Sequence, residues 1–391
     1  MIAVLLLVSP LESIGLDVYT PALPKIAVEF AASNALAQNT VTVYVLGMTL
    51  VVLPAGLVAD AFGRKRVLLS ALTLMTVTSI GCAMAQSATE LLGLRFLQGL
   101  GAGTCLLLAA TIAADRFRGA QLVSVLGLLG AAWGAAPVLA PAVGGFVVQF
   151  GSWRLVFVLL AVVAGSVTVL AARVLPETLT EERRVPVDLR SAASVLGRAL
   201  RHRAFLGFVL MFGLVGAAQT VFGVVGPFLY QADLSFSPGA YGVIALAVGG
   251  ANLVGALVCG GLARRVANRR LALAAAAVLM AGAAVLVGSA ALIGVDAWAI
   301  TAGAMLALLG IGVLDPLSKG LAMSVFGNNI GLIAGFVNTC CYLSITVAMA
   351  VMAYLPERSQ APLGWLYLGA GVLFAGLLLV TLPRSAHHAN A

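Results

Sequence analysis

Charged residues are scarce in this chain of 391 residues, because Asp, Glu, Lys and Arg together make up only 9% of it. An average soluble domain contains about 25% charged residues, so the composition excludes a water-soluble globular protein. Apolar residues make up 62% of the chain, and the mean hydropathy is +1.10. These values are typical of a polytopic helical membrane protein, because helices satisfy their backbone hydrogen bonds internally in lipid.

Patterns that bind metals or nucleotides are also lacking. The chain contains no P-loop, which argues against an ATP-driven pump, and no nucleophile–base arrangement. We therefore expect no enzyme, no bound metal and no organic cofactor. No basic segment precedes Lys25, so we expect no cleavable signal peptide. The cysteines all fall within apolar runs without metal-ligand spacing to a histidine, and we expect free thiols at Cys82, Cys105, Cys259, Cys340 and Cys341.

Long apolar runs account for most of the sequence. A membrane-spanning helix needs about 20 predominantly apolar residues. Runs of this kind lie at 2–24, 38–59, 66–87, 91–114, 121–149, 153–175, 204–230, 238–263, 271–294, 297–325, 330–355 and 362–383. We therefore predict an all-α polytopic membrane protein with twelve transmembrane helices in two six-helix halves.

The cations predict the orientation of the chain in the membrane. With both termini cytoplasmic, the opposite side holds only Lys25, Arg154 and Arg358. The cytoplasmic loops then hold Arg64, Lys65, Arg66, Arg116, Arg118, the 183–203 cluster, Arg264, Arg265, Arg269 and Arg270. Retained positive charge marks the cytoplasmic side, so we predict cytoplasmic termini. The net charge of +8 is thereby explained by topology, and nucleic acid is not expected as a partner.

One long polar segment, 176–203, separates the two sets of six apolar runs. It carries mixed charges and no long apolar run, so we predict a solvated cytoplasmic linker with a short amphipathic helix at 188–201. The predicted domains are a six-helix half at 1–175, this linker, and a second six-helix half at 204–391.

A repeat supports the two-half division. The segment 56–66 reads GLVADAFGRKR, and the segment 261–270 reads GLARRVANRR. In this alignment Arg64 matches Arg269. Weak internal repetition of six-helix halves is a signature of transporter folds.

The second copy differs from the first at two informative positions. Asn268 stands where the first copy has Gly63, and asparagine is the residue that best replaces glycine at a left-handed turn. Arg265 stands where the first copy has Asp60. We therefore expect a similar turn in the second loop, but without its acid.

The first copy resembles the loop between helices 2 and 3 of the major facilitator superfamily of secondary transporters. In that family the loop helps to lock the cytoplasmic ends of the two halves. The resemblance implies a conformational latch that includes Gly56, Asp60, Gly63, Arg64 and Arg269. The alternative is a simple positive-inside loop.

The stretch 91–103 resembles the helix-4 motif of the same family, with Arg95, Gln98 and Gly99 at its core. The resemblance implies that Arg95 takes part in proton coupling and that Gln98 lies one turn away on the cavity side. An arginine inside a span needs a partner or water. The alternative is that Arg95 snorkels to the nearby interface.

The stretch 134–145 resembles the family's helix-5 motif, which is associated with antiporters. Two prolines four residues apart remove backbone donors and are expected to bend the helix, and two glycines allow close packing at the kink. The predicted antiporter kink consists of Pro137, Pro141, Gly144 and Gly145. The family usually has glycine where Ala136 stands here. The pattern favours antiport over symport, and the alternative is a packing role alone.

The first span carries the pattern Asp-x-Tyr-x-Pro-x-x-Pro at Asp17, Tyr19, Pro21 and Pro24. It is similar to a signature of the bicyclomycin and chloramphenicol resistance group within the drug:proton antiporters. An acid inside a span is a functional-site hypothesis, and burial favours the neutral form of a carboxyl. We therefore predict that Asp17 binds and releases the coupling proton. The alternative is a capping role at the outer interface.

Glu12 is a second acid in the first span. It precedes Asp17 by five residues, which places it about 140° away around a helix, so the two acids need not share one pocket. Relatives with two acids in this helix carry the earlier one further upstream, where Ser9 stands here. Proton coupling and a structural role are both open for Glu12.

The tenth span contains Asp315 and Lys319. Residues at i and i+4 share a helix face, so these two side chains could form an internal ion pair. Binding of substrate and movement of protons are the alternatives. Drug pockets are mostly apolar with a few oriented polar groups, and the predicted cavity residues are Tyr19, Tyr44, Gln98, Trp133, Gln219, Phe222, Tyr230, Asp315, Asn338 and Tyr342.

The resemblance implies a proton-coupled antiporter that exports drugs or other small amphipathic compounds by alternating access. Protons are the expected coupling ion, the bacterial inner membrane the expected location, and a monomer the expected functional unit. A dedicated exporter of one metabolite, such as a sugar, an amino acid or an endogenous antibiotic, is the first alternative. A membrane-embedded enzyme or a channel-like receptor is the second.

Overall fold

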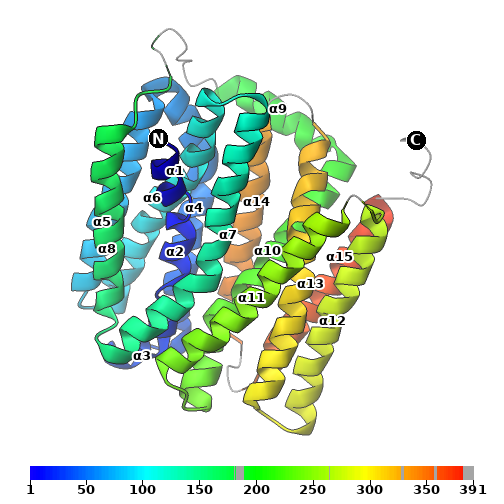
Figure 1. Ribbon diagram of the computed structural model, residues 1–391. Helices are drawn as coiled ribbons and strands as arrows, with labels where there is room; N and C mark the ends of the chain where they lie inside the picture. The colour runs from blue at the N-terminus through cyan, green and yellow to red at the C-terminus, as the bar shows by residue number, and fades with distance from the viewer. Residues whose placement is uncertain (180, 182–188, 264, 327–329, 356–358, 382–391) are drawn as a thin grey trace. The chain divides into compact units, whose positions relative to one another are not determined.

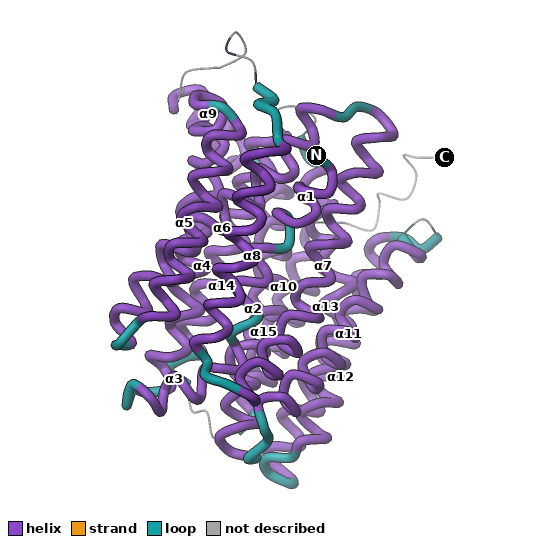
Figure 2. Tube along the Cα trace, turned by 60° about the vertical axis from the view of Figure 1, so that its left-hand side comes forward, coloured by secondary structure: helices purple, strands orange, loops and turns teal. Residues whose placement is uncertain are grey.

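The computed structural model describes residues 1–391 except 180, 182–188, 264, 327–329, 356–358 and 382–391. The described residues are mostly helical and contain no strand (Figure 2). The first helices are α1 (Ile2–Val8), α2 (Leu11–Asp17), η1 (Thr20–Ala22), α3 (Leu23–Glu29), α4 (Asn34–Phe62), α5 (Arg64–Met84), α6 (Ala88–Arg116), α7 (Gly119–Phe150) and α8 (Arg154–Val174). The later ones are α9 (Leu189–Arg201), α10 (Arg203–Pro227), η3 (Phe228–Asp233), α11 (Pro238–Leu262), α12 (Asn268–Leu292), α13 (Ala297–Ser324), α14 (Ile330–Met352) and α15 (Ala361–Thr381).

Twelve stretches of the described chain are long and apolar enough to span a membrane, one for each predicted run. The all-α polytopic fold is therefore confirmed. The largest shift of a boundary is in the first span, which ends at Glu29 rather than at 24. Its polar end is held by the protein, because Lys25 Nζ donates to the carbonyl of Val148 over 2.6 Å.

Side-chain caps explain where several helices begin. The hydroxyl of Ser33 accepts a hydrogen bond from the Leu36 amide at the start of α4, and Asp296 accepts one from Ala299 at the start of α13. Such caps satisfy backbone N–H groups that have no partner within the helix. The predicted linker helix is present as α9, whereas Asp188, its first predicted residue, lies outside the described residues.

The first span is interrupted rather than continuous. It consists of α1, α2, η1 and α3, with Pro10 between the first two helices and Pro21 inside η1. Proline lacks an amide hydrogen and disrupts a helix interior. The breaks leave α2 as a separate short segment that carries both Glu12 and Asp17.

By contacts the chain forms two compact units, and Figure 1 labels the helices that belong to them. Unit 1 consists of Met1–Ala192 and Gly226–Leu246, and unit 2 of Ala193–Val225 and Ala247–Ala391. In unit 1, α6 packs on α4 and α5, and α5 packs on α8; in unit 2, α12 packs on α13 and α15. The division into six-helix halves at the linker 176–203 stays a prediction.

Glycines allow α4 and α6 to approach each other closely in unit 1. A Cβ on Gly99 would overlap the backbone of Tyr44, and one on Gly47 would overlap the carbonyl of Phe96. Small residues permit this contact between membrane helices. It brings Tyr44 next to the turn of α6 that carries Arg95.

Candidate functional site: a buried arginine beside two acids

Arg95 lies in the interior of unit 1 and has no exposed surface. Its Nη1 donates to the carbonyl of Gly15 over 3.0 Å and also to Oε1 of Gln98. A longer contact of 3.5 Å joins its Nε to the carbonyl of Thr40. Arg95 therefore does not snorkel to an interface, and its guanidinium joins α6 to α2 and α4.

Aromatic rings cover the guanidinium of Arg95. Its Cζ lies 4.1 Å from the ring centroids of both Tyr19 and Tyr44, and 5.9 Å from that of Phe157. A cation over an aromatic face is stabilised by the ring quadrupole, more strongly where water is excluded. No described carboxylate lies within ion-pairing distance of Arg95. Its charge is thus held by neutral groups, and its Nη2 is buried without a hydrogen-bond partner among the described residues.

Gln98 is held in one orientation by a chain of hydrogen bonds. Its Nε2 donates to the hydroxyl of Ser79 over 2.6 Å, and that hydroxyl donates to the carbonyl of Met75 over 2.6 Å. The side-chain oxygen of Gln98 is therefore left to accept from Arg95. Gln98 has no exposed surface, so it belongs to the packed surroundings of Arg95 in this structure.

The two acids of the first span lie on the same short helix, α2. Asp17 is half-buried, and its Oδ2 accepts a hydrogen bond from Ser13 over 3.1 Å. Glu12 is buried, and its Oε2 accepts from the indole nitrogen of Trp133 over 2.7 Å. The Tyr44 hydroxyl donates to the backbone carbonyl of Glu12 over 2.7 Å. One tyrosine thus contacts both the acid-bearing helix and Arg95.

The structure brings many predicted site residues of unit 1 into one cluster. Its members contact one another through α2 and the guanidinium, and they are Glu12, Asp17, Tyr19, Tyr44, Arg95, Gln98 and Trp133. Sequence reasoning missed the carbonyl of Gly15, Ser13 and Ser79. The i, i+4 spacing of Ser13 and Asp17 was the only local signal for any of them.

The predicted antiporter kink lies in α7, which continues without a break through Pro137 and Pro141. Gly144 faces the backbone carbonyl of Val18, and a Cβ there would overlap it. Gly145 faces the carbonyl of Pro238, also within unit 1. These two glycines provide close helix packing beside the acid-bearing segment.

Two of the predicted latch residues, Asp60 and Arg64, belong to a charged cluster at one end of unit 1. Arg64 forms ion pairs with Asp60 and, over 3.2 Å, with Asp115. The carboxylate of Glu177 accepts from the backbone amides of Arg64 and Lys65 over 3.0 and 3.2 Å, so it caps α5. Sequence reasoning missed Asp115 and Glu177, because both are distant in the chain.

Two glycines accompany this cluster. Gly63 joins α4 to α5 with a φ of 96°, which favours glycine because it has no Cβ. Gly56 lies within α4 and faces the side chain of Leu107.

The second loop does not repeat the geometry of the first. Asn268 begins α12, and among the described residues the only non-glycines with positive φ are Ala31 and Ser235. The expectation that Asn268 occupies a left-handed turn is therefore wrong. The chain turns earlier, where the carbonyl of Leu262 accepts from the amides of Arg265 and Val266. Nε of Arg269 is buried without a hydrogen-bond partner among the described residues.

The other predicted cavity residues are distributed over several helices. Tyr230 has no exposed surface and contacts the rings of Phe236 and Tyr241 within unit 1. Phe222 is buried in α10, and the remaining side chains in unit 2 are half-buried, namely Gln219, Asp315, Asn338 and Tyr342. Their role as cavity residues stays a prediction.

The predicted ion pair between Asp315 and Lys319 is not formed, because no salt bridge of 4.0 Å or less joins them. The Lys319 ammonium instead lies 5.5 Å from the ring centroid of Phe212.

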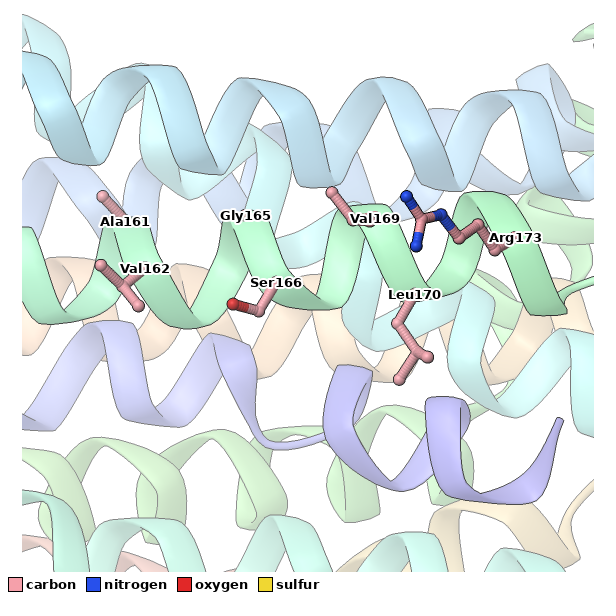
Figure 3. Close-up of a pocket in the computed structure, with 7 residues that line it drawn as sticks. All are labelled: Ala161, Val162, Gly165, Ser166, Val169, Leu170 and Arg173. Carbon is pink, nitrogen blue, oxygen red and sulfur yellow. The ribbon is translucent and has the colours of Figure 1, made fainter.

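Two hollows on the helices lie away from the predicted site residues. One of about 550 Å³ lies along a single face of α8, between Ala161 and Arg173 (Figure 3). The other, of about 530 Å³, lies in unit 2 between Leu214, Ser344 and Trp365. Neither is lined by a predicted proton-coupling or cavity residue.

Comparison with known proteins gives the family. The model of the Major Facilitator Superfamily matches residues 5–349. The uncharacterized MFS-type transporter YdgK of Bacillus subtilis is 32% identical over 236 residues, which are 60% of this chain and 59% of YdgK. The multidrug resistance protein MdtL of Escherichia coli O157:H7 is 32% identical over 239 residues, 61% of this chain and 60% of MdtL. The matches thus span about three fifths of these curated relatives.

Solved structures share the fold at low sequence identity. A D-xylose-proton symporter superimposes with a TM-score of 0.79 at 16% identity, covering 98% of this chain and 97% of that one. The human organic anion transporter MFSD10 has a TM-score of 0.67 at 18% identity, with 97% and 98% coverage. The fold, the twelve spans and the match over most of the chain agree, and the chain belongs to the Major Facilitator Superfamily of transporters.

Proposed function

We propose that this transporter is a proton-coupled antiporter that exports drugs or other small amphipathic compounds from the cytoplasm by alternating access. The observation that carries the proposal is the Arg95 guanidinium, buried without an ion pair and bound to the acid-bearing helix α2. Charged groups inside a membrane are costly and mark proton and substrate pathways. The similarity to MdtL, named a multidrug resistance protein, supports the choice of cargo.

Asp17 is the acid best suited to exchange a proton. It is half-buried at the end of α2, whereas Glu12 is buried against Trp133. Arg95 donates to the carbonyl of Gly15 on the same helix, α2, and we assign to it the tuning of proton exchange at Asp17. Protonation of Asp17 would remove a negative charge from α2, and Ser13, which donates to Asp17, could then reorient.

The orientation of the chain in the membrane and the role of the charged cluster around Arg64 belong to the same proposal. We assign the cluster of Asp60, Arg64, Asp115 and Glu177 to the cytoplasmic side of a bacterial inner membrane, with both termini on that side. The consecutive cations Arg64, Lys65 and Arg66 at this loop support the orientation. The cluster would hold the ends of α4, α5 and α6 together while the transporter changes state.

The test is transport by the purified chain in liposomes with an imposed pH gradient. Asp17→Asn is expected to insert and fold but to lose proton-driven export of a fluorescent drug, because its amide cannot exchange the proton. Asp296→Asn is the matched control, since asparagine also caps a helix and this acid lies before α13 rather than inside it. Export by Asp17→Asn at the wild-type rate would exclude Asp17 as the coupling acid.

A further inference from the structure

Unit 2 contains one acid within its candidate spans, Asp315, and one lysine in its whole sequence, Lys319. Both lie in α13, one helical turn apart. Lys319 precedes the end of the helix at Ser324 by five residues, or about 7.5 Å along the axis. Ionisable residues at such positions face protein or water rather than lipid, because a charge in hydrocarbon is costly.

These opposite charges do not satisfy each other. No salt bridge of 4.0 Å or less joins them, although they interact electrostatically at longer range. The same spacing and the same order of acid and cation produce an ion pair between Asp60 and Arg64 in unit 1. Spacing alone therefore does not decide whether an ion pair forms. Asp60 and Arg64 lie on two helices joined at Gly63, whereas Asp315 and Lys319 lie within one helix.

Asp315 and Lys319 each have a defined environment in the structure. Lys319 is exposed, and its ammonium lies 5.5 Å from the ring centroid of the buried Phe212. Asp315 is half-buried and lies near Cys259 of α11. Among the described residues, none donates a hydrogen bond to the carboxylate of Asp315, and none accepts one from the ammonium of Lys319.

The packing of α13 on α11 holds the acid in place. Gly312 faces the backbone of Asn252, and Gly255 faces the carbonyl of Leu309, each too closely for a Cβ. Pro316 follows Asp315 directly and removes one backbone donor from the helix between the two charges. The acid therefore follows a closely packed stretch of α13, and the amine lies one turn further on at an exposed position.

We propose that Asp315 and Lys319 form a subsite for a compact zwitterion carried on an apolar body. The ligand's ammonium would bind Asp315 and its carboxylate would bind Lys319. Charge-assisted hydrogen bonds of this kind are stronger than neutral ones. A ligand with a single charge would satisfy one member only. The residues of α13 around the two charges are mostly apolar, which suits an apolar body.

The identification of this ligand as an exported substrate rests on the proposed transport function, whereas its binding does not. The two are tested separately. Binding is measured on the purified full chain in detergent without any gradient, and export is measured in liposomes with a pH gradient. Binding without export would contradict the transport proposal and leave the subsite supported.

The probe is Nε-dansyl-lysine, a fluorescent compact zwitterion. Its methyl ester keeps only the ammonium, and its Nα-acetyl derivative keeps only the carboxylate. We expect the zwitterion to bind at least about tenfold more tightly than either derivative, which corresponds to about 1.4 kcal/mol. Equal affinities for the three probes, or no measurable binding of the zwitterion, would overturn the proposal.

Variants then test which charge of the ligand each of the two residues binds. Asp315→Asn should abolish the preference for the zwitterion over the anionic derivative, and Lys319→Gln should abolish the preference over the cationic derivative. The exchanged pair Asp315→Lys with Lys319→Asp should regain part of the preference, because the ligand can bind in the reverse direction. Lys319→Arg keeps the positive charge and should therefore keep the preference for the zwitterion.

Controls separate charge recognition from folding and from snorkelling. Arg173→Gln removes an exposed cation within a span of unit 1 and should leave the preference unchanged. Each variant is compared by size-exclusion profile and melting temperature before titration. If Lys319 only snorkels to the interface, Lys319→Gln will bind all three probes as the wild type does, and the subsite is refuted.

Discussion

The two units treat their charged residues differently. In unit 1, Arg64 pairs with Asp60 and Asp115, Arg154 pairs with Glu29, and Arg95 is enclosed by tyrosine rings and carbonyls. In unit 2, no ion pair joins the described residues. Unit 1 therefore uses its charged residues to hold helices together. Under the proposal for Asp315 and Lys319, unit 2 leaves its charges available for a ligand.

Two pairs with the same spacing show the difference most directly. Asp60 and Arg64 are four residues apart and form an ion pair, whereas Asp315 and Lys319 are four apart and do not. Arg64 has a second acid, Asp115, and a planar fork that suits carboxylates. Lys319 carries a single ammonium on a flexible stem and lies over an aromatic ring.

The largest expected effect comes from removing the buried charge of unit 1. Arg95→Ala should destabilise the protein by about 3 kcal/mol or more, because it leaves a cavity between two tyrosine rings and frees the carbonyl of Gly15. The melting temperature in detergent should fall steeply, and export should be lost. Arg95→Lys should fold better, yet its ammonium lacks the planar guanidinium that lies between the two tyrosine rings and reaches Thr40 as well as Gly15. Normal export by Arg95→Lys would show that charge alone is sufficient.

An intermediate effect is expected where unit 1 packs most closely. Gly144→Ala should destabilise the protein by about 1–3 kcal/mol, because its methyl group overlaps the carbonyl of Val18. Gly134→Ala in the same helix is the matched control, since nothing lies within 4 Å of its Cβ position. This control should be neutral or stabilising by up to about 1 kcal/mol, as expected for alanine in a helix. Equal melting temperatures for the two variants would contradict the assigned contact.

The smallest expected effect is the difference in stability between variants of the two copies of the loop. Arg64→Gln should destabilise the protein by about 1–2 kcal/mol, because it removes ion pairs with Asp60 and Asp115 that are partly screened by solvent. Arg269→Gln should change stability by less than about 0.5 kcal/mol, since no described residue pairs with Arg269. Thermal unfolding of both variants in the same detergent measures the difference. A larger loss for Arg269→Gln would show that the second loop has an equivalent cluster.

Sequence reasoning was most successful where the structure is local. Apolar runs of sufficient length predicted all twelve spans. The resemblance of 91–103 to a family motif singled out Arg95 and Gln98, and the structure joins their side chains by a hydrogen bond. It was least successful at the second loop, where the similarity of Asn268 to Gly63 predicted a turn that the chain makes elsewhere. A turn type depends on the backbone around it, and one shared residue type does not determine it.

Composition and local pattern were enough to predict the membrane fold, the twelve helices and the residues that carry charge into the spans. These depend on composition and on contacts within one helix, which neighbouring residues decide. Only the tertiary structure decided which charges are paired. It enclosed Arg95 between Tyr19 and Tyr44, brought Glu177 to the start of α5, and left Asp315 and Lys319 apart. The physical reason is that a charge inside a membrane is stabilised by groups from other helices, whose positions no local spacing specifies.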